Sequence, residues 1–418
     1  MTEPKKLQKK AVVLGAGPGG YVAAIRLAQL GVETAIVDKA YLGGVCLNVG
    51  CIPSKALIHA SKLVSSIQGA GAMGVNVGKL SVDLEKMVEW KDGIVERLTT
   101  GIGTLLKKRK VEILMGEGRF AGSRELEVTA ADGARTLVAF EHAIVATGSR
   151  PIQVPGFEFD GEKVLTSTDA LSLTSLPRSL VVIGGGVIGL EIGTVLAKFG
   201  TELTVVEMMD QLLPGTDKEL VDVVARELKK KKVALHLSSK ATKLEKTKKG
   251  VKVEGEGPGG AFSVEAELLL VTVGRRPNTE NLGLEAAGVK TTRGFIEVNE
   301  KMETSAKGIY AIGDVSGPPL LAHKASKEGM VAAERIAGKP SVADWKAMPA
   351  ATFTDPEVAT TGLQESEARA KGIEVTIGRF PYQASGRALS TNQAFGLVKV
   401  IADKKTGIVL GAGIVGAE

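Results

Sequence analysis

The chain has 418 residues, of which 44% are hydrophobic and 24% charged, with a formal net charge of +6. This length exceeds one ordinary hydrophobic core, so about two to four domains are expected. The basic residues form lysine-rich stretches without interleaved aromatic side chains, which argues against nucleic acid as a partner. No apolar run approaches the roughly 18 residues of a membrane span. The N-terminus lacks the pattern of a signal peptide, so no membrane association and a cytoplasmic location are expected.

A glycine-rich turn follows the first apolar strand. Residues 12–14 run into Gly15, Gly17 and Gly20, and a helical pattern then leads to a second apolar strand ending at Asp38. The first glycine permits a tight turn, the second lets the backbone approach a pyrophosphate, and the third lets helix and strand pack closely. The acid accepts hydrogen bonds from a ribose diol. This segment predicts a dinucleotide-binding unit.

Both cysteines of the chain, Cys46 and Cys51, follow directly on this unit. A structural zinc site needs four ligands, and only His59 among the histidines lies near the pair, so no metal is expected. Two inert buried thiols remain an alternative. Pro53 suits the first turn of a helix that starts near Cys51. Because a helix N-terminus stabilises a thiolate, the pattern favours Cys51 as a poised thiolate and the pair as a reversible disulfide.

The dinucleotide pattern occurs a second time, at residues 179–209. Gly184, Gly186 and Gly189 follow an apolar strand, and Glu207 ends the next one. In both copies the acid lies 21 residues after the middle glycine (38 − 17 and 207 − 186). A carboxylate here repels a 2′-phosphate and no arginine follows at once, so this site is expected to prefer NAD(H) over NADP(H). NAD alone reacts poorly with a disulfide, whereas a flavin can pass electrons between them, so FAD is expected in the first site.

The remaining strands and turns indicate the domain borders. Apolar strands at 142–151 and 268–278 each break in a turn of glycine, arginine and proline, and the strand at 308–315 ends in Gly-Asp. The lysine-rich stretch 229–249, with the glycines of 255–260, is interpreted as a hairpin region. The predicted domains are an FAD-binding domain with the redox disulfide (1–150), an NAD-binding domain (151–276), a central domain that completes the FAD site (277–346) and a partial dimerisation domain of strands (347–418).

Several of these motifs together resemble one enzyme family. "CLNVGCIPSK", "ATGSRP", "GRRPN", "AIGDV" and the two glycine patterns resemble the pyridine nucleotide–disulfide oxidoreductases, over nearly the whole chain. The resemblance implies an α/β fold with two Rossmann-like dinucleotide-binding domains, for FAD and NAD, plus an incomplete α+β interface domain. The motifs are most similar to those of members that oxidise protein-bound dihydrolipoamide with NAD. Glu207 argues against glutathione reductases, and the lack of a third cysteine argues against mercuric reductases. A non-catalytic FAD- and NAD-binding module of a multienzyme complex, or another flavin–disulfide reductase, remain alternatives.

The resemblance also implies roles for single residues. Cys46 is similar to the thiol that exchanges with dihydrolipoamide, and Cys51 to the thiol that forms a charge-transfer complex with the flavin. Lys55 is similar to the lysine near flavin N5, and Glu191 to its ion-pair partner. The implied FAD contacts are Gly15, Gly17, Gly20, Asp38, Lys55, Gly118, the backbone of Thr147 and Gly148, Asp314 and Ala322, and the implied NAD contacts are Gly184, Gly186, Gly189, Glu207 and Gly274. His59 and His323 match no base of the family and are expected to be structural.

The last predicted domain departs from the family pattern. Family members carry a histidine near the C-terminus that serves as general base in the partner subunit of a homodimer, and no histidine follows His323 here. The resemblance therefore implies a C-terminally truncated chain with a weakened dimer. Turnover of lipoamide is expected to fall by roughly 10²–10⁴-fold, while oxidation of NADH by dyes persists. The implied partners are lipoyl domains and the acyltransferase core of 2-oxo-acid dehydrogenase complexes, in the cytoplasm or the mitochondrial matrix.

Overall fold

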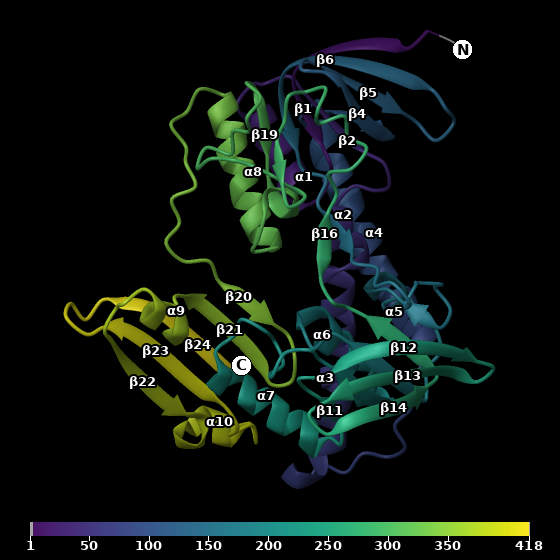
Figure 1. Cartoon of the computed structure of the whole chain (residues 1–418), viewed down its shortest axis with the longest axis vertical. Helices are drawn as coiled ribbons and strands as arrows, with labels where there is room; N and C mark the ends of the chain where they lie inside the picture. Colours follow the sequence, from purple (N-terminus) through teal and green to yellow (C-terminus); the bar gives the residue numbers. More distant parts are fainter. Residues whose placement is uncertain (1–2, 418) are drawn as a thin grey trace. The chain divides into compact units, whose positions relative to one another are not determined.

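The computed structural model describes residues 3–417, which divide into two compact units (Figure 1). Unit 1 comprises Met1–Pro53, Asp92–Arg150 and Arg275–Asp344, and unit 2 comprises Ser54–Lys91, Pro151–Gly274 and Trp345–Glu418. Helices α3 (Cys51–Gly69) and α4 (Leu84–Lys108) each continue from one unit into the other. No helix within the described residues is long and apolar enough to cross a membrane.

Unit 1 is built on a seven-stranded sheet in the order β3-β2-β1-β6-β5-β4, with β19 also paired to β6. The strands are β1 (Lys5–Leu14), β2 (Thr34–Asp38), β3 (Glu112–Met115), β4 (Glu117–Gly122), β5 (Glu125–Thr129), β6 (Arg135–Val145) and β19 (Ile309–Ala311). Strands β3, β2, β1, β6 and β19 are parallel, whereas β4 and β5 pair antiparallel. Helices α1 (Pro18–Gln29) and α8 (Ala322–Ile336) lie side by side (Figure 1).

The second half of β1, residues 11–14, is buried on both faces, which explains its continuous apolar run. Ala11 and Val13 belong to one core, together with the apolar residues of α1 and α8. Val12 and Leu14 point to the opposite face and belong to a second core with the residues of β4, β5 and β6. Two filled faces fix the register of β1, and its carboxyl end therefore places the first glycine-rich turn in one position.

Unit 2 contains a second parallel sheet in the order β11-β10-β9-β15-β8. Its strands are β8 (Val164–Leu165), β9 (Ser179–Ile183), β10 (Glu202–Val206), β11 (Ala234–His236) and β15 (Leu268–Val271). Helices α6 (Val187–Phe199) and α7 (Lys218–Lys230) pack on it through a large apolar core. The strands β12 (Lys240–Thr247), β13 (Gly250–Gly257) and β14 (Gly260–Ala266) form an antiparallel meander.

The hairpin interpretation of the lysine-rich stretch is correct for its second half only. Lys229 and Lys230 lie in the last turn of α7, where cations interact favourably with the negative end of the helix dipole. The hairpins begin with β12 at Lys240. Composition alone does not separate the two, because a solvated lysine face suits either element.

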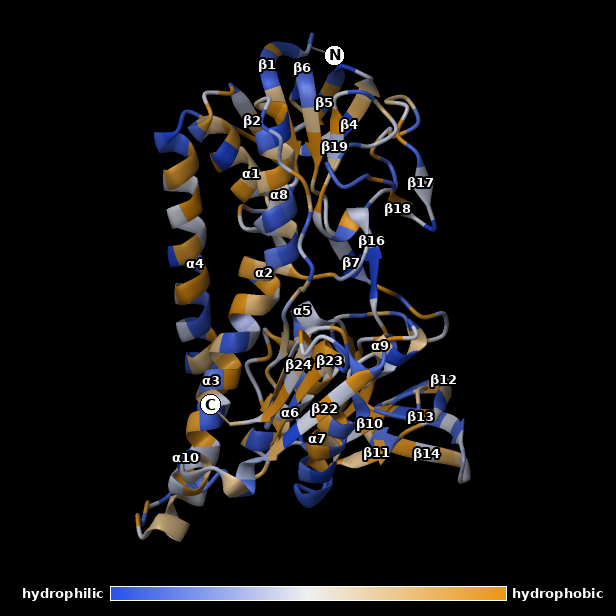
Figure 2. Cartoon of the chain, turned by 90° about the vertical axis from the view of Figure 1, so that its left-hand side faces the viewer, coloured by the Kyte–Doolittle hydropathy of each residue, from blue (hydrophilic) through white to orange (hydrophobic). Residues whose placement is uncertain are grey.

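A five-stranded antiparallel sheet in the order β20-β21-β24-β23-β22 completes unit 2. Its elements are β20 (Ala350–Thr352), β21 (Glu357–Gly362), α9 (Glu365–Ala370), β22 (Val375–Pro381), α10 (Gly386–Ser390), β23 (Leu397–Asp403) and β24 (Val409–Gly416). The strands predicted within 347–418 are therefore confirmed. Figure 2 shows hydrophobic residues running along β23 and β24 at the middle of this sheet.

Short elements connect these layers. They are α2 (Gly44–Val49), η1 (Ala70–Met73), β7 (Ser149–Pro151), α5 (Ser167–Ala170), β16 (Arg275–Pro277), β17 (Thr291–Thr292), β18 (Phe295–Ile296), η2 (Gly313–Ser316) and η3 (Tyr382–Ala384). Strand β7 pairs with β16, and β17 pairs with β18. The division of the chain into four domains remains a prediction.

A buried lysine links this last sheet to α7 by ion pairs within unit 2. The side chain of Lys399 is 2% exposed, and its ammonium lies 2.7 Å from Asp217, 3.2 Å from Glu219 and 2.7 Å from Glu365. Arg379 also pairs with Glu219, at 2.6 Å. Hydrogen bonds from Arg379, and then from Lys399, lower the pKa of Glu219 from its ordinary 4.5 to about 2.

The depressed pKa of Glu219 predicts an acid-dependent stability. Its ionised form stabilises the fold fully above about pH 4.5, and the contribution is lost as the pH falls from there toward about 2. Glu219→Gln is therefore expected to lower the urea midpoint most near neutral pH, with a difference from the parent that shrinks below about pH 4.5. Glu202→Gln, at an exposed position on β10, is the matched control. A difference that is the same at every pH contradicts this account.

Candidate functional site

The two cysteines form a disulfide in unit 1. Cys46 lies in α2, Cys51 is the first residue of α3, and their Cα atoms are 4.6 Å apart. The predicted helix start is therefore confirmed, and Cys51 sits at the positive end of the α3 dipole, which stabilises a thiolate. Lys55 follows four residues later in α3, about one helical turn away.

The disulfide segment is built directly against the first glycine-rich turn. Gly43 and Gly44 adopt left-handed conformations, with φ of +92° and +60°. The N–H of Gly43 donates to the carbonyl of Ala16 at 2.8 Å. A Cβ on Gly44 would lie 2.4 Å from the Cα of Gly17, so only glycine fits there. The segment that carries the disulfide and the first dinucleotide motif therefore pack directly against each other within unit 1.

The outer glycines of both motifs are required by the protein itself. A Cβ on Gly15 would lie 2.2 Å from the carbonyl oxygen of Ala146, and one on Gly20 would lie 1.8 Å from that of Gly15. In the second motif a Cβ on Gly184 would lie 2.6 Å from the carbonyl oxygen of Thr272, and one on Gly189 would lie 2.4 Å from that of Gly184. These glycines allow the turn and the close contact of helix and strand.

The middle glycines are not required by the protein. Gly17 and Gly186 have ordinary extended conformations, with φ of −69° and −80°. The nearest atom to a Cβ on Gly17 would be 3.9 Å away, and within the described chain none lies within 4 Å of one on Gly186. A ligand that must approach the backbone closely explains both glycines. The two turns therefore fit a dinucleotide pyrophosphate.

The same two glycines are the N-caps of α1 and α6, and neither helix has a side-chain cap. The N–H groups of each first helical turn are therefore left without the side-chain acceptor that usually satisfies them. Together with the helix dipole they form an anion-binding site. Both turns offer the same chemistry to phosphate oxygens.

The acids of the two motifs repeat one hydrogen bond. Asp38 accepts from the N–H of Ala16 at 2.7 Å, and Glu207 accepts from the N–H of Gly185 at 2.7 Å. Glu207 also accepts from the N–H of Met209, at 2.8 Å. Asp38 also accepts from the N–H groups of Ala40 and Tyr41, at 2.9 and 3.2 Å. A carboxylate offers about four lone-pair sites, so Asp38 keeps about one of them for a ribose hydroxyl and Glu207 about two. The residues of both motifs fit FAD and NAD.

Around Asp314 the structure shows partners that sequence reasoning missed. Asp314, in η2, accepts a hydrogen bond from the hydroxyl of Ser149. Arg275 donates from Nε to that hydroxyl oxygen at 2.7 Å and from its guanidinium to the Ser149 carbonyl at 2.6 Å. Thr147 exchanges bonds of 2.7 and 2.9 Å with Asn278. The motif "GRRPN" contained Arg275 and Asn278, but nothing in it indicated these partners.

A buried ion pair supports the same segment from α8. The side chains of Lys324 and Glu328 are 5% and 4% exposed and lie 3.0 Å apart. Lys324 donates to the carbonyls of Gly313 and Gly317 at 3.1 and 2.7 Å, and Glu328 accepts from the N–H of Gly313 at 2.7 Å. Burial raises the pKa of Glu328. The spacing of four residues was a usable signal for this pair, because residues four apart face each other on a helix.

The other predicted cofactor contacts occupy varied positions. Gly118 lies on β4, and a Cβ there would be 2.4 Å from Cδ1 of Leu14, so close strand packing already explains this glycine. Gly148 and Gly274 have φ of +67° and +124°. Ala322 is the first residue of α8. Their contacts with cofactor remain proposals.

Lys55 and Glu191 meet within unit 2. The ammonium of Lys55 lies 2.8 Å from Glu191, whose side chain on α6 is 5% exposed. A buried carboxylate needs such a partner, because desolvation of an unpaired charge is costly. His59 and His323 lie on α3 and α8. Among residues 3–417 no group of three or more His, Cys, Asp or Glu side chains could hold a metal.

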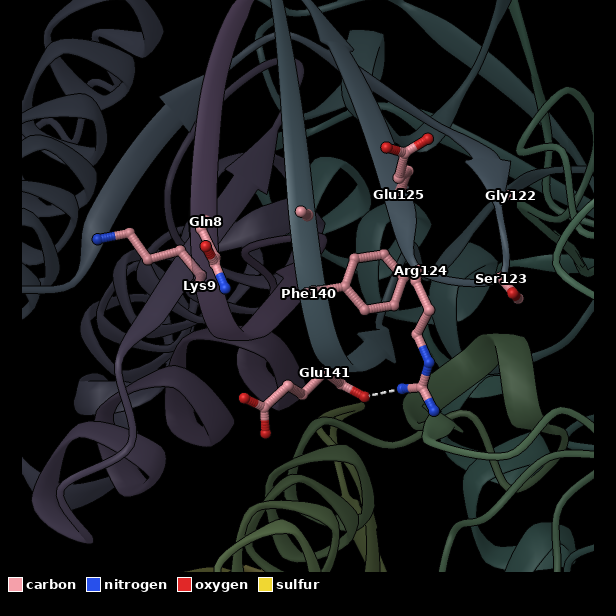
Figure 3. Close-up of a pocket in the computed structure, with 9 residues that line it drawn as sticks. Gln8, Lys9, Gly122, Ser123, Arg124, Glu125, Phe140 and Glu141 are labelled. Atoms are coloured by element: carbon pink, nitrogen blue, oxygen red, sulfur yellow. Dashed lines mark hydrogen bonds between the residues drawn. The ribbon is translucent and has the colours of Figure 1, made fainter.

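A surface hollow of unit 1 lies away from these motifs (Figure 3). It is lined in part by Gln8 and Lys9 of β1, and by Arg124, which donates to the carbonyl of Glu141. The glycine-rich turn starts at Gly15, six residues beyond Lys9, or about 20 Å along an extended strand. The hollow is therefore not the predicted cofactor site.

Comparison with known proteins agrees with this arrangement. Residues 9–329 match the family model for pyridine nucleotide-disulphide oxidoreductases, and residues 348–418 match the dimerisation domain of that family. A dihydrolipoyl dehydrogenase of Geobacillus stearothermophilus is 48% identical over 98% of this chain and 87% of the relative. One of Bacillus subtilis is 47% identical over 99% of this chain and 88% of the relative.

Solved structures show the same fold. LpdA of Mycobacterium tuberculosis superposes with a TM-score of 0.90 at 29% identity, over 97% of this chain and 90% of that one. The HOCl-induced flavoprotein disulfide reductase RclA of Escherichia coli superposes with a TM-score of 0.85 at 27% identity, over 98% and 90%. The chain belongs to the pyridine nucleotide-disulphide oxidoreductase family, and the fold class and the FAD and NAD cofactors predicted from its sequence are those of this family.

Proposed function

We propose that this chain oxidises protein-bound dihydrolipoamide with NAD, through the Cys46–Cys51 disulfide and bound FAD. The observation that supports this most directly is the disulfide at the start of α3, set against the first dinucleotide turn. The second turn and Glu207 supply a site for the final acceptor. The relatives at 47–48% identity carry the name dihydrolipoyl dehydrogenase.

The two half-reactions balance. The two thiols of dihydrolipoamide become a disulfide, and the Cys46–Cys51 disulfide becomes two thiols. FAD, held by the first glycine-rich turn and Asp38, would supply the two-electron transfer that links this dithiol to NAD⁺. The sum is dihydrolipoamide plus NAD⁺ giving lipoamide, NADH and a proton. Cys51, at the N-terminus of α3, is suited to hold the thiolate next to the cofactor, and Cys46 to exchange with substrate.

A substrate panel tests the proposal. The purified protein is expected to be yellow, to reduce NAD⁺ with dihydrolipoamide, and to leave glutathione disulfide and Hg²⁺ unchanged. A colourless protein that takes up no FAD contradicts the proposal. A bound flavin that NADH does not reduce favours a non-catalytic binding module instead.

The nucleotide preference gives a separate prediction. Glu207→Ala removes the acceptor for the ribose diol and the repulsion of a 2′-phosphate. The KM for NADH is expected to rise roughly 10- to 100-fold, the value of a lost hydrogen bond to a charged group. The KM for NADPH is expected to fall. Asp38→Ala is the matched control in the first motif, and it should weaken retention of FAD without changing the choice of nicotinamide nucleotide.

The proposal extends to partners and location. The dimerisation-domain match over 348–418 supports a homodimer, and the substrate class supports lipoyl domains and the acyltransferase core of 2-oxo-acid dehydrogenase complexes as partners. The location we propose is the cytoplasm or the mitochondrial matrix. Sedimentation of the purified protein reports its oligomeric state.

A further inference from the structure

Phe353 contacts both members of the Lys55–Glu191 pair. It follows β20 directly, inside the segment that matches the dimerisation domain. Its backbone N–H donates to Oε1 of Glu191 at 2.9 Å. The ammonium of Lys55 lies 4.6 Å from the centroid of its ring. With the 2.8 Å contact of Lys55 to Oε2 of Glu191, each of the three residues touches the other two.

This arrangement restrains the lysine more than the ion pair alone. Glu191 is almost fully buried, and each of its oxygens has a different donor. Lys55 is 34% exposed along its side chain, so its flexible stem has other rotamers open to it. The negative face of an aromatic ring attracts an ammonium and favours the rotamer that places it there. The carboxylate and the ring therefore hold the ammonium together.

The ring is itself fixed in place within unit 2. The segment after it is held by Asp355, which pairs with Lys198 of α6 at 3.0 Å and with Lys231 at 2.9 Å. The hydroxyl of Thr354 donates to the carbonyl of Pro356 at 2.7 Å. The ring also packs against the large apolar core of the unit. A ring held on this many sides can orient a mobile side chain.

We propose that Phe353 is a positioning residue, which holds the Lys55 ammonium in the rotamer that the redox reaction uses. This inference rests on the proposed function, since it takes Lys55 to act at the flavin. It gives the dimerisation segment a part in the redox centre of its own chain. The contact needs no residue from a second subunit.

The first test does not depend on catalysis. Phe353→Leu removes the ring and keeps the backbone N–H that donates to Glu191. Acylation of Lys55 by acetic anhydride, measured by mass spectrometry on the whole protein, is expected to rise about 3- to 10-fold. Lys62, on the same helix and paired with Glu357, is the internal reference and should not change. Phe353→Met, which also lacks a ring, should behave like Phe353→Leu, and Phe353→Tyr should behave like the parent.

The second test measures the reaction. In Phe353→Leu the stopped-flow rate of flavin reduction by NADH, and the long-wavelength absorbance after two-electron reduction, are expected to fall, the rate by about 3- to 10-fold. Phe380→Leu, an exposed phenylalanine of β22, is the matched control. In a Lys55→Met background Phe353→Leu should have no further effect on either quantity.

Two results overturn the positioning role. One is a ratio of Lys55 to Lys62 acylation that is the same in Phe353→Leu and Phe353→Met as in the parent. The other is a rate that falls by the same factor with and without Lys55, since this shows a general effect on the fold. Failure of the proposed function is a different outcome, in which the parent protein binds no FAD or its flavin is not reduced by NADH. The acylation test still measures the contact between Phe353 and Lys55 in that case.

Discussion

Replacing Cys51 by serine is expected to lower NAD⁺ reduction by dihydrolipoamide by at least about 10³-fold, because the electrons then have no disulfide to enter. The substitution removes one sulfur and leaves the half-buried position at the start of α3 filled by a residue of similar size. FAD content and oxidation of NADH by a dye should persist, since neither passes through the cysteines. Steady-state rates with dihydrolipoamide and with the dye, on the same preparation, measure both.

Cys46→Ser separates the roles of the two sulfurs. It should abolish lipoamide turnover equally but leave Cys51 as a lone thiol at the helix N-terminus, where its thiolate is stabilised. A long-wavelength absorbance band is therefore expected in the oxidised protein. Cys51→Ser should show no such band. The band appearing in Cys51→Ser instead would reverse the assignment.

The second large effect is expected at the middle glycine of the NAD motif. Gly186→Ala places a methyl group where no described atom lies within 4 Å, in an extended conformation that alanine adopts freely. Its cost to folding should stay below about 1 kcal/mol, the scale of an N-cap change. At the proposed NAD site, by contrast, the methyl group would meet the pyrophosphate. Overpacking of this kind predicts a roughly 10- to 100-fold higher KM for NADH.

Gly189→Ala is the matched comparison three residues later. Its methyl group would lie 2.4 Å from the carbonyl oxygen of Gly184 and 2.5 Å from Oγ1 of Thr272, so the free protein itself must shift. A loss of about 1–3 kcal/mol in unfolding free energy is expected, measured by urea titration. If Gly186→Ala destabilises the nucleotide-free protein as much as Gly189→Ala does, the middle glycine has a structural role and the ligand explanation is wrong.

The sequence was most informative where a short stretch specifies its own geometry. The spacing from Gly17 to Asp38, and from Gly186 to Glu207, predicts a strand, a turn, a helix and a second strand. The structure contains both of these strand–turn–helix–strand segments. Cys51 at a helix start was also predictable, from its distance to Pro53. In each case the constraints lie within about 20 residues of one another, and the pattern needs no knowledge of tertiary packing.

Contacts between distant segments were not predictable. Phe353 meets Glu191 across 162 positions, and nothing in "ATFTDP" distinguishes this phenylalanine from an ordinary core residue. The same holds for Arg275 with Ser149, 126 positions apart. The first half of β1, from Lys5, is polar and has no strand pattern of its own, and it becomes a strand because β6 pairs with it. Tertiary pairing overrides weak local preference in such segments.

The disulfide has one further consequence, which concerns measurement. Cys46 and Cys51 are the two cysteines in these 418 residues, and they are bonded to each other. In the oxidised protein a maleimide or Ellman's reagent therefore finds no thiol in this chain, and after reduction it finds two, both from the redox centre. The number of reactive thiols therefore reports the oxidation state of the Cys46–Cys51 pair, with no contribution from other cysteines of this chain. The reduction potential of the disulfide can be measured by titration against a thiol buffer, whether or not flavin is bound.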